Sequence, residues 1–161
     1  MTFIKPPPSI YYSYAIGRGE TGVLTFEPYK SHLLPMWRFR TVPIARSSSA
    51  ELYAKFLEFH KHEDFVGMDM ARKFIQMGMT RAKRYANHKG GKKYGNDGEI
   101  LERGQVTEAM IEKEEASKVF KDVWERCKEF EGYKELRAIW EAEKKEWIRM
   151  HKEEKTTKDE A

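Results

Sequence analysis

The chain has 161 residues, of which 35% are charged and 40% hydrophobic, and its formal net charge is +4. A chain of this length can bury a sizeable core, so we expect a single domain over residues 1–161. The lone cysteine excludes an intramolecular disulfide, and neither a membrane span nor a secretory signal is visible, so we expect a cytoplasmic or nuclear protein with no membrane partner.

Positive charge is concentrated in one part of the chain. Residues 1–96 carry 16 basic and 7 acidic side chains, whereas residues 97–161 carry 14 and 19. The segment 70–96 has eight lysines or arginines and no acid. Like charges in one segment repel unless an anion is nearby, so this segment predicts a polyanionic partner, above all nucleic acid. The acidic C-terminal region either packs near the basic segment or keeps non-specific anions away from it, and the sequence leaves both open.

Residues 9–27 are predicted to form a β-hairpin, because two aromatic and apolar runs flank a glycine-rich turn. Gly17, Gly19 and Gly22 have the spacing of a phosphate-binding glycine motif, but a strand-like run follows them where that motif requires a helix. A flexible turn is therefore favoured. The alternative is a phosphate-contacting loop with Arg18 at its tip.

Two elements are predicted between residues 28 and 63. The segment 28–46 contains two prolines and is predicted to be an ordered irregular connection. A helix is predicted to begin at Ser48, because Glu51 follows it at the spacing of a capping box, and to end near residues 60–63.

A second helix is predicted from Asp64 to about His88, with the glycines at 90 and 91 ending it. Its apolar residues recur at helical spacing, and a helical wheel places most of its cations, Lys73 among them, on the accessible side. The methionines of this region are expected to pack adaptably around Gly67 and Gly78, which have no side chains and permit close helix approach.

The predicted nucleic-acid surface combines this basic helix with the tryptophan segment that precedes it. Phosphate contacts would supply most of the affinity, and exposed aromatic rings could stack on unpaired bases, which favours RNA over DNA. Tyr85 is expected to be a core residue. The residues assigned to the surface are Trp37, Arg38, Arg40, Arg72, Lys73, Arg81, Lys83, Arg84, Asn87, His88, Lys89, Lys92, Lys93 and Tyr94.

No catalytic residue, cofactor or metal is assigned from the sequence. An enzyme acting on a nucleotide or nucleic-acid phosphate is one alternative, with Arg18, Arg72 and Arg84 as phosphate clamps and His88 or Glu27 as acid or base. His88 is also explained as an ordinary residue at a helix end.

Four neighbouring polar residues could offer metal ligands or a general base, but their spacing matches no metal motif. All four can instead be surface residues at a helix junction, where the last of them caps the next helix, and this explanation needs no metal. These residues are His60, His62, Glu63 and Asp64.

Residues 105–153 are predicted to form the C-terminal helices, and 154–161 a disordered tail. The first helix should run from Thr107 to Glu131, with Gly132 as its stop. A further alternative function is a protein-interaction adaptor that exposes Trp140 and Trp147 on these helices. The expected fold is mainly α with a small N-terminal β-hairpin (α+β): a compact helical domain with a C-terminal helical extension.

Four strings of sequence are distinctive: EPYKS at 27–31, LPMWRF at 34–39, DFVGMDMARKF at 64–74 and RYANHKGG at 84–91. Together they resemble a domain-of-unknown-function family, DUF4385, of fungi, bacteria and tailed phages. The resemblance covers roughly residues 10–94 and implies no activity or catalytic residue. It does imply that the basic helix and the tryptophan segment belong to one module, to which the C-terminal helices are a possible addition.

Overall fold

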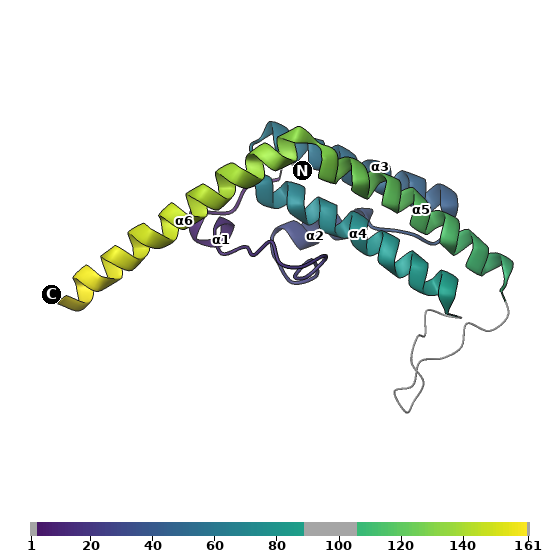
Figure 1. Cartoon of the computed structure of the whole chain (residues 1–161), viewed down its shortest axis with the longest axis horizontal. Helices are drawn as coiled ribbons and strands as arrows, with labels where there is room; N and C mark the ends of the chain where they lie inside the picture. The colour runs from purple at the N-terminus through teal and green to yellow at the C-terminus, as the bar shows by residue number, and fades with distance from the viewer. Residues whose placement is uncertain (1–2, 89–105, 161) are drawn as a thin grey trace, which may run out of the picture.

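The computed structural model describes residues 3–88 and 106–160, with side chains as far as residue 152. This part of the chain is helical and contains no strand, which confirms the mainly α fold (Figure 1). None of its helices is both long enough and apolar enough to cross a membrane. In chain order the helices are α1 (Pro8–Tyr11), α2 (Tyr29–Leu33), the 3-10 helix η1 (Leu34–Met36), α3 (Val42–Lys61), α4 (Phe65–Asn87), α5 (Glu108–Glu129) and α6 (Glu131–Glu160).

The predicted N-terminal β-hairpin, and with it the α+β class, is wrong. Pro8 opens the short helix α1, and residues 18–25 form successive turns closed by local hydrogen bonds, such as that from the Thr21 amide to the Arg18 carbonyl at 3.1 Å. Apolar residues from both expected strands, namely Tyr11, Tyr14 and Val23, are buried in the common core, whereas Ile10 and Leu24 are exposed. Their pattern therefore reflects packing against helices and not strand pairing.

Helix α3 begins six residues before the predicted start at Ser48. Thr41 is its N-cap and accepts a hydrogen bond from the Ile44 amide at 3.3 Å. The Ser48 hydroxyl instead donates to the Met36 carbonyl at 2.6 Å and accepts from the Arg38 amide at 2.9 Å. Ser48 thus fixes the preceding connection to the helix, while the predicted end near residues 60–63 is confirmed.

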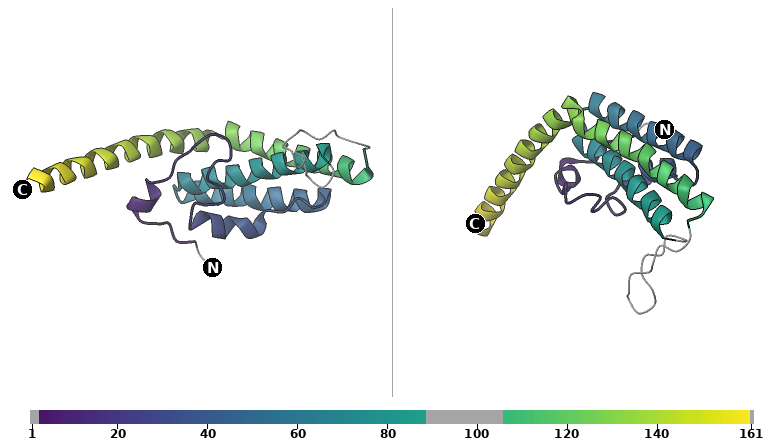
Figure 2. Two further views of the ribbon diagram at one scale, coloured as in Figure 1. Left: turned by 90° about the horizontal axis from the view of Figure 1, so that it is seen from below. Right: turned by 45° about the vertical axis from the view of Figure 1, so that its right-hand side comes forward.

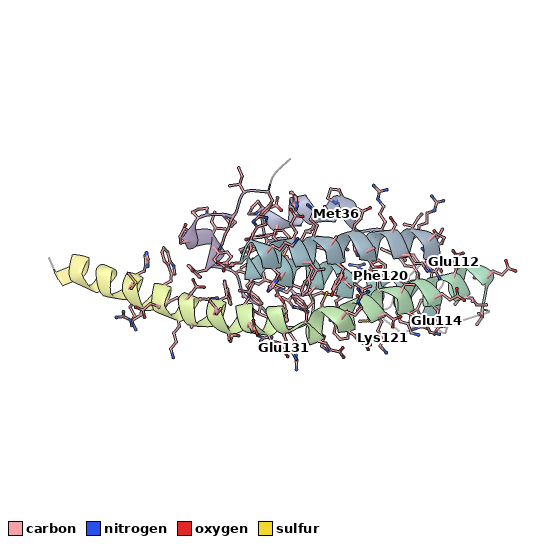
Figure 3. All side chains as sticks on the ribbon, turned by 90° about the horizontal axis from the view of Figure 1, so that it is seen from above. Met36, Glu112, Glu114, Phe120, Lys121 and Glu131 are labelled. Atoms are coloured by element: carbon pink, nitrogen blue, oxygen red, sulfur yellow. The ribbon has the colours of Figure 1, made fainter. Side chains whose placement is uncertain are left out.

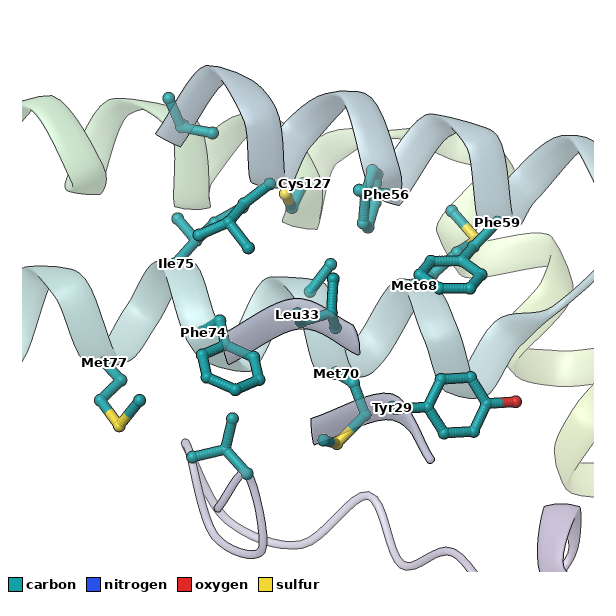
Figure 4. Packing of buried hydrophobic residues seen from close by; sticks show 14 of the residues in the cluster. Tyr29, Leu33, Phe56, Phe59, Met68, Met70, Phe74, Ile75, Met77 and Cys127 are labelled. Atoms are coloured by element: carbon teal, nitrogen blue, oxygen red, sulfur yellow. The ribbon is translucent and has the colours of Figure 1, made fainter. Parts of the chain in front are cut away.

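Helix α4 lies at the centre of the molecule, and its bounds agree with the prediction to within one residue at each end. Its N-cap is Asp64, which accepts from the Gly67 amide at 2.9 Å. Helices α3 and α5 pack against it, and Figure 4 shows Phe56 and Phe59 of α3 on one side of α4 and α2 on the other. A Cβ atom at Gly67 would lie 2.3 Å from the Phe59 ring, so the expected close approach at this glycine is confirmed.

Helix α5 begins within one residue of the predicted start at Thr107, which is its N-cap, but Gly132 does not stop it. The chain turns at Phe130, whose ψ of 120° is non-helical, and Gly132 lies in the first turn of α6. Trp140 is buried, which contradicts its expected exposure, and Trp147 is half-buried and packs on the Tyr12 ring at 5.8 Å.

The later part of α6 leaves the body of the molecule (Figures 1 and 2). Ile148 and Met150 lie in this part and are about half exposed, at 52% and 47%. The helix continues to Glu160, through the segment for which the sequence predicts a disordered tail.

Candidate nucleic-acid interface

The basic segment is divided between the interior and the surface of the protein. Arg72 and Lys73, in the first half of α4, are buried beside the fully buried Asp69. Arg72 Nε donates to Asp69 Oδ1 at 2.8 Å, and Lys73 Nζ lies 3.8 Å from Asp69 Oδ2. The hydroxyls of Tyr14 and Tyr133 also donate to this carboxylate. Asp69 therefore neutralises charge inside the fold.

The N-terminal turns cover the side of α4 that the helical wheel left open. Lys73 Nζ donates to the carbonyl oxygens of Ala15 and Thr21 at 3.3 and 2.7 Å. Burial lowers the pKa of Lys73 to about 8, although the neighbouring Asp69 carboxylate opposes that shift. The prediction that Lys73 lies on the accessible side is therefore wrong. Lys73 is fully buried and therefore does not face a ligand, and Arg72 is largely held inside the fold.

The second half of α4 forms one wall of a groove whose other wall is α5. Its cavity volume is about 780 Å³. Of its lining residues in the described part of the chain, four are lysine or arginine and one is an acid, Glu114, which pairs with Lys83 at 2.8 Å. We call this hollow the basic groove; its lining residues are Met79, Thr80, Lys83, Arg84, Asn87, His88, Glu114, Ser117, Lys118, Lys121 and Trp124.

Sequence reasoning missed the α5 half of the basic groove. Lys118 and Lys121 contribute two of its four cations, and Figure 3 shows Lys121 on the outer side of α5, whereas Phe120 points between the helices. The Ser117 hydroxyl fixes the two helices together by donating to the Met79 carbonyl at 2.9 Å. Residues 114, 117, 118, 121 and 124 follow the three-four spacing of one helical face. That spacing was a usable signal, hidden by the overall acidity of the C-terminal region.

Two aromatic rings also line the basic groove. Trp124 is half-buried, and Lys128 Nζ lies 3.9 Å from the centroid of its ring. His88 lies at the C-terminal end of α4, where its amide donates to the Arg84 carbonyl at 2.9 Å. Within the described residues, Nε1 of Trp124 and Nδ1 of His88 are buried without a hydrogen-bond partner. The groove thus offers both cations and ring surface to a ligand.

The tryptophan segment does not line the groove. Trp37 is half-buried and packs against the Phe39 and Phe74 rings at centroid distances of 5.1 and 6.4 Å. Lys113 of α5 holds this segment by donating to the carbonyls of Phe39 and Arg40 at 3.0 and 2.7 Å. The ring of Trp37 therefore serves packing.

The remaining predicted surface residues are scattered. Arg38, Arg40 and Arg81 are exposed outside the groove, and in the described part of the chain Arg81 and Arg84 make no ion pair. Tyr85 is 38% exposed, so its assignment to the core is wrong. Four further predicted residues lie outside the described residues: Lys89, Lys92, Lys93 and Tyr94.

The groups named for the enzyme alternative are not brought together. Arg72 and Arg84 lie on one helix about 18 Å apart along its axis, at about 1.5 Å per residue. Glu27 accepts hydrogen bonds from the amide and hydroxyl of Ser31, and Arg18 lies on an exposed turn. These residues therefore do not form a joint phosphate clamp.

Two of the four residues considered as metal ligands, Asp64 and His60, have structural partners. Asp64 caps α4 and accepts from the Tyr29 hydroxyl at 2.9 Å, and the His60 ring packs edge-on against Phe130 at 5.0 Å. Among residues 3–88 and 106–152, no three histidine, cysteine or acidic side chains are grouped so as to hold a metal ion.

The family model described as domain of unknown function, DUF4385, matches residues 8–143. The match extends past the expected limit at residue 94, through α5 and into α6. The helix that completes the basic groove is therefore part of the family domain and not an addition to it. No curated protein and no solved structure was found to match the chain.

Proposed function

We propose that this chain, which belongs to the DUF4385 family of domains of unknown function, binds nucleic acid in the basic groove, and RNA in preference to DNA. The observation that carries the proposal is the charge of the groove walls. Lys83, Arg84, Lys118 and Lys121 come together from two helices, and among the described lining residues Glu114 is the one acid.

Charge of this kind is costly unless an anion offsets it. Within the described residues, Lys83 pairs with Glu114 at 2.8 Å, and that pair is partly exposed, so it contributes at most about 1 kcal/mol. A nucleic-acid backbone would place phosphates against the other cations and release its counterions, which is the main source of affinity in such complexes.

The shape of the site favours a single strand over a duplex. A helix that reads duplex DNA enters the major groove and must protrude from its domain. Here the cations line a hollow between two packed helices, and Trp124 provides a ring within it. Flexible strands with unstacked bases fit such hollows, and RNA is recognised mostly in that form.

The test is fluorescence anisotropy with labelled single-stranded RNA, duplex RNA and duplex DNA, with dextran sulfate as competitor. The variant Lys118→Glu/Lys121→Glu reverses two groove cations, and Arg46→Glu/Lys61→Glu is the matched control, since both of its sites are exposed on α3 outside the groove. We expect RNA to remain bound in the presence of dextran sulfate. The RNA affinity should fall by at least about tenfold in the groove variant and stay unchanged in the control. Unchanged affinity in a folded groove variant would refute the proposal.

A further inference from the structure

A second hollow, which we call the Arg72 pocket, lies beyond Trp124 on the same side of α5. Its volume is about 440 Å³, and it is bounded by the N-terminal turns, α4, α5 and the first turns of α6. Four cations line it: Arg72, Lys128, Lys134 and Arg137. No carboxylate is among its described lining residues, and Trp124 lines both this pocket and the basic groove.

The floor of the Arg72 pocket is rigidly built. The Arg72 side chain, 9% exposed, donates from Nε to Asp69 at 2.8 Å and from Nη1 to Gln76 Oε1 at 2.9 Å. Both Nη atoms also lie 3.3 Å from the Gly19 carbonyl oxygen. Tyr133, another lining residue, donates to the same Asp69 carboxylate at 2.7 Å. A cation fixed in this way needs little reordering when an anion binds.

The charges around the pocket leave an excess of cations. The Asp69 carboxylate is shared by Arg72 and Lys73, so it cannot offset the three cations at the rim. Two of these cations do pair with carboxylates, Lys134 with Glu131 at 3.4 Å and Arg137 with Glu141 at 3.2 Å. Both pairs are about half exposed or more, and such pairs hold their partners only weakly. The rim cations are therefore available to a stronger anion.

We propose that the Arg72 pocket binds the phosphate group of a nucleotide. Its volume falls within the range of about 300–1,000 Å³ that is usual for small-molecule sites, which is more than an inorganic ion needs. Rim lysines and an arginine above a fixed guanidinium suit a phosphate, which accepts several charge-assisted hydrogen bonds at once. The phosphate can belong to a free mononucleotide or to the 5′ end of a strand in the adjoining groove. The proposal does not depend on the basic groove, because a free nucleotide needs no second site.

The test is calorimetric titration of the full chain with AMP and, as the ligand lacking phosphate, adenosine. The variant Lys128→Glu/Arg137→Glu reverses two exposed rim cations, and Lys118→Glu/Lys121→Glu makes the same charge change in the basic groove. We expect AMP to bind at least about tenfold more tightly than adenosine, and this preference to vanish in the rim variant alone. Equal binding of the two ligands, or an AMP affinity that the folded rim variant retains, would overturn the proposal.

Two RNA oligonucleotides of one sequence, with a 5′-phosphate or a 5′-hydroxyl, distinguish the two sources of the phosphate. A preference for the 5′-phosphate that disappears in the rim variant assigns the pocket to a strand end. Equal RNA affinities together with AMP binding assign it to a free nucleotide. Failure of the groove proposal would look different, since the groove variant would then leave RNA affinity unchanged while AMP binding persisted.

Discussion

Replacing Asp69 by asparagine should lower the free energy of unfolding by about 3–5 kcal/mol, the usual cost of removing one partner from a buried ion pair. The carboxylate is fully buried and serves two buried cations and two tyrosine hydroxyls. Asparagine keeps the size but not the charge, so Arg72 and Lys73 would be left uncompensated. Small domains are stable by about 5–15 kcal/mol, so the variant should be close to unfolding.

Urea denaturation followed by circular dichroism measures this loss. The control is Glu58→Gln, which removes the charge of a partly exposed pair with Lys55 at 3.0 Å and should cost less than about 1 kcal/mol. The double variant Asp69→Asn/Lys73→Met should be more stable than the sum of its single changes implies, because it also removes one of the unpaired cations. A loss at Asp69→Asn no larger than that of the control would refute the internal neutralisation described above.

Three further outcomes follow from the described contacts. Thr41→Ala removes the N-cap of α3 and should lower the free energy of unfolding, measured by urea denaturation, by about 1 kcal/mol. The control Ser47→Ala changes an exposed residue inside the same helix and should not have this cost. Equal effects of the two changes would contradict the observed helix start. Glu114→Gln should tighten RNA binding, because it removes a negative charge from the groove wall, and weaker binding in anisotropy would count against the groove. Stability should fall in urea melts as pH rises from 10.5 to 11.5: burial raises the pKa of four tyrosines, so the unfolded chain releases their protons above about pH 10 while the folded protein retains them. The pKa of Lys73 is lowered to about 8, so Lys73 makes stability rise with pH, but only up to its unfolded pKa of about 10.4. A free energy of unfolding that stays constant above that pH would therefore contradict the burial of the four tyrosines. These are Tyr11, Tyr14, Tyr29 and Tyr133.

Local signals placed the two long helices that form the basic groove. Asp64 and Thr107 are side-chain caps in the structure, and apolar periodicity between each cap and the helix end gave bounds within two residues of those observed. Both signals are local, because a cap and an amphipathic face depend on residues three or four positions apart.

The errors arise where distant segments meet. The aromatic residues of 10–16 have the composition of a strand, and only the position of α4 shows that they pack on a helix. The helical wheel predicted that Lys73 is exposed, because a wheel of one helix cannot show that residues 15 and 21 cover this side chain. Asp69 precedes Lys73 by four residues, which is the spacing of an ion pair on a helix. This spacing was a local signal that Lys73 could be buried beside a carboxylate. The α5 cations joined the candidate site only through the packing of α5 beside α4.

The most direct test of the basic groove is the salt dependence of RNA binding in the variant Arg84→Ala/Lys121→Ala. Removing two phosphate contacts should make the plot of log affinity against log salt concentration shallower by about 1.4, since each single-strand phosphate contributes about 0.7. The control Arg46→Ala/Lys61→Ala removes the same charge from α3 and should keep the wild-type slope. If the groove variant instead has the wild-type slope while the control becomes shallower, the nucleic acid binds elsewhere on the protein.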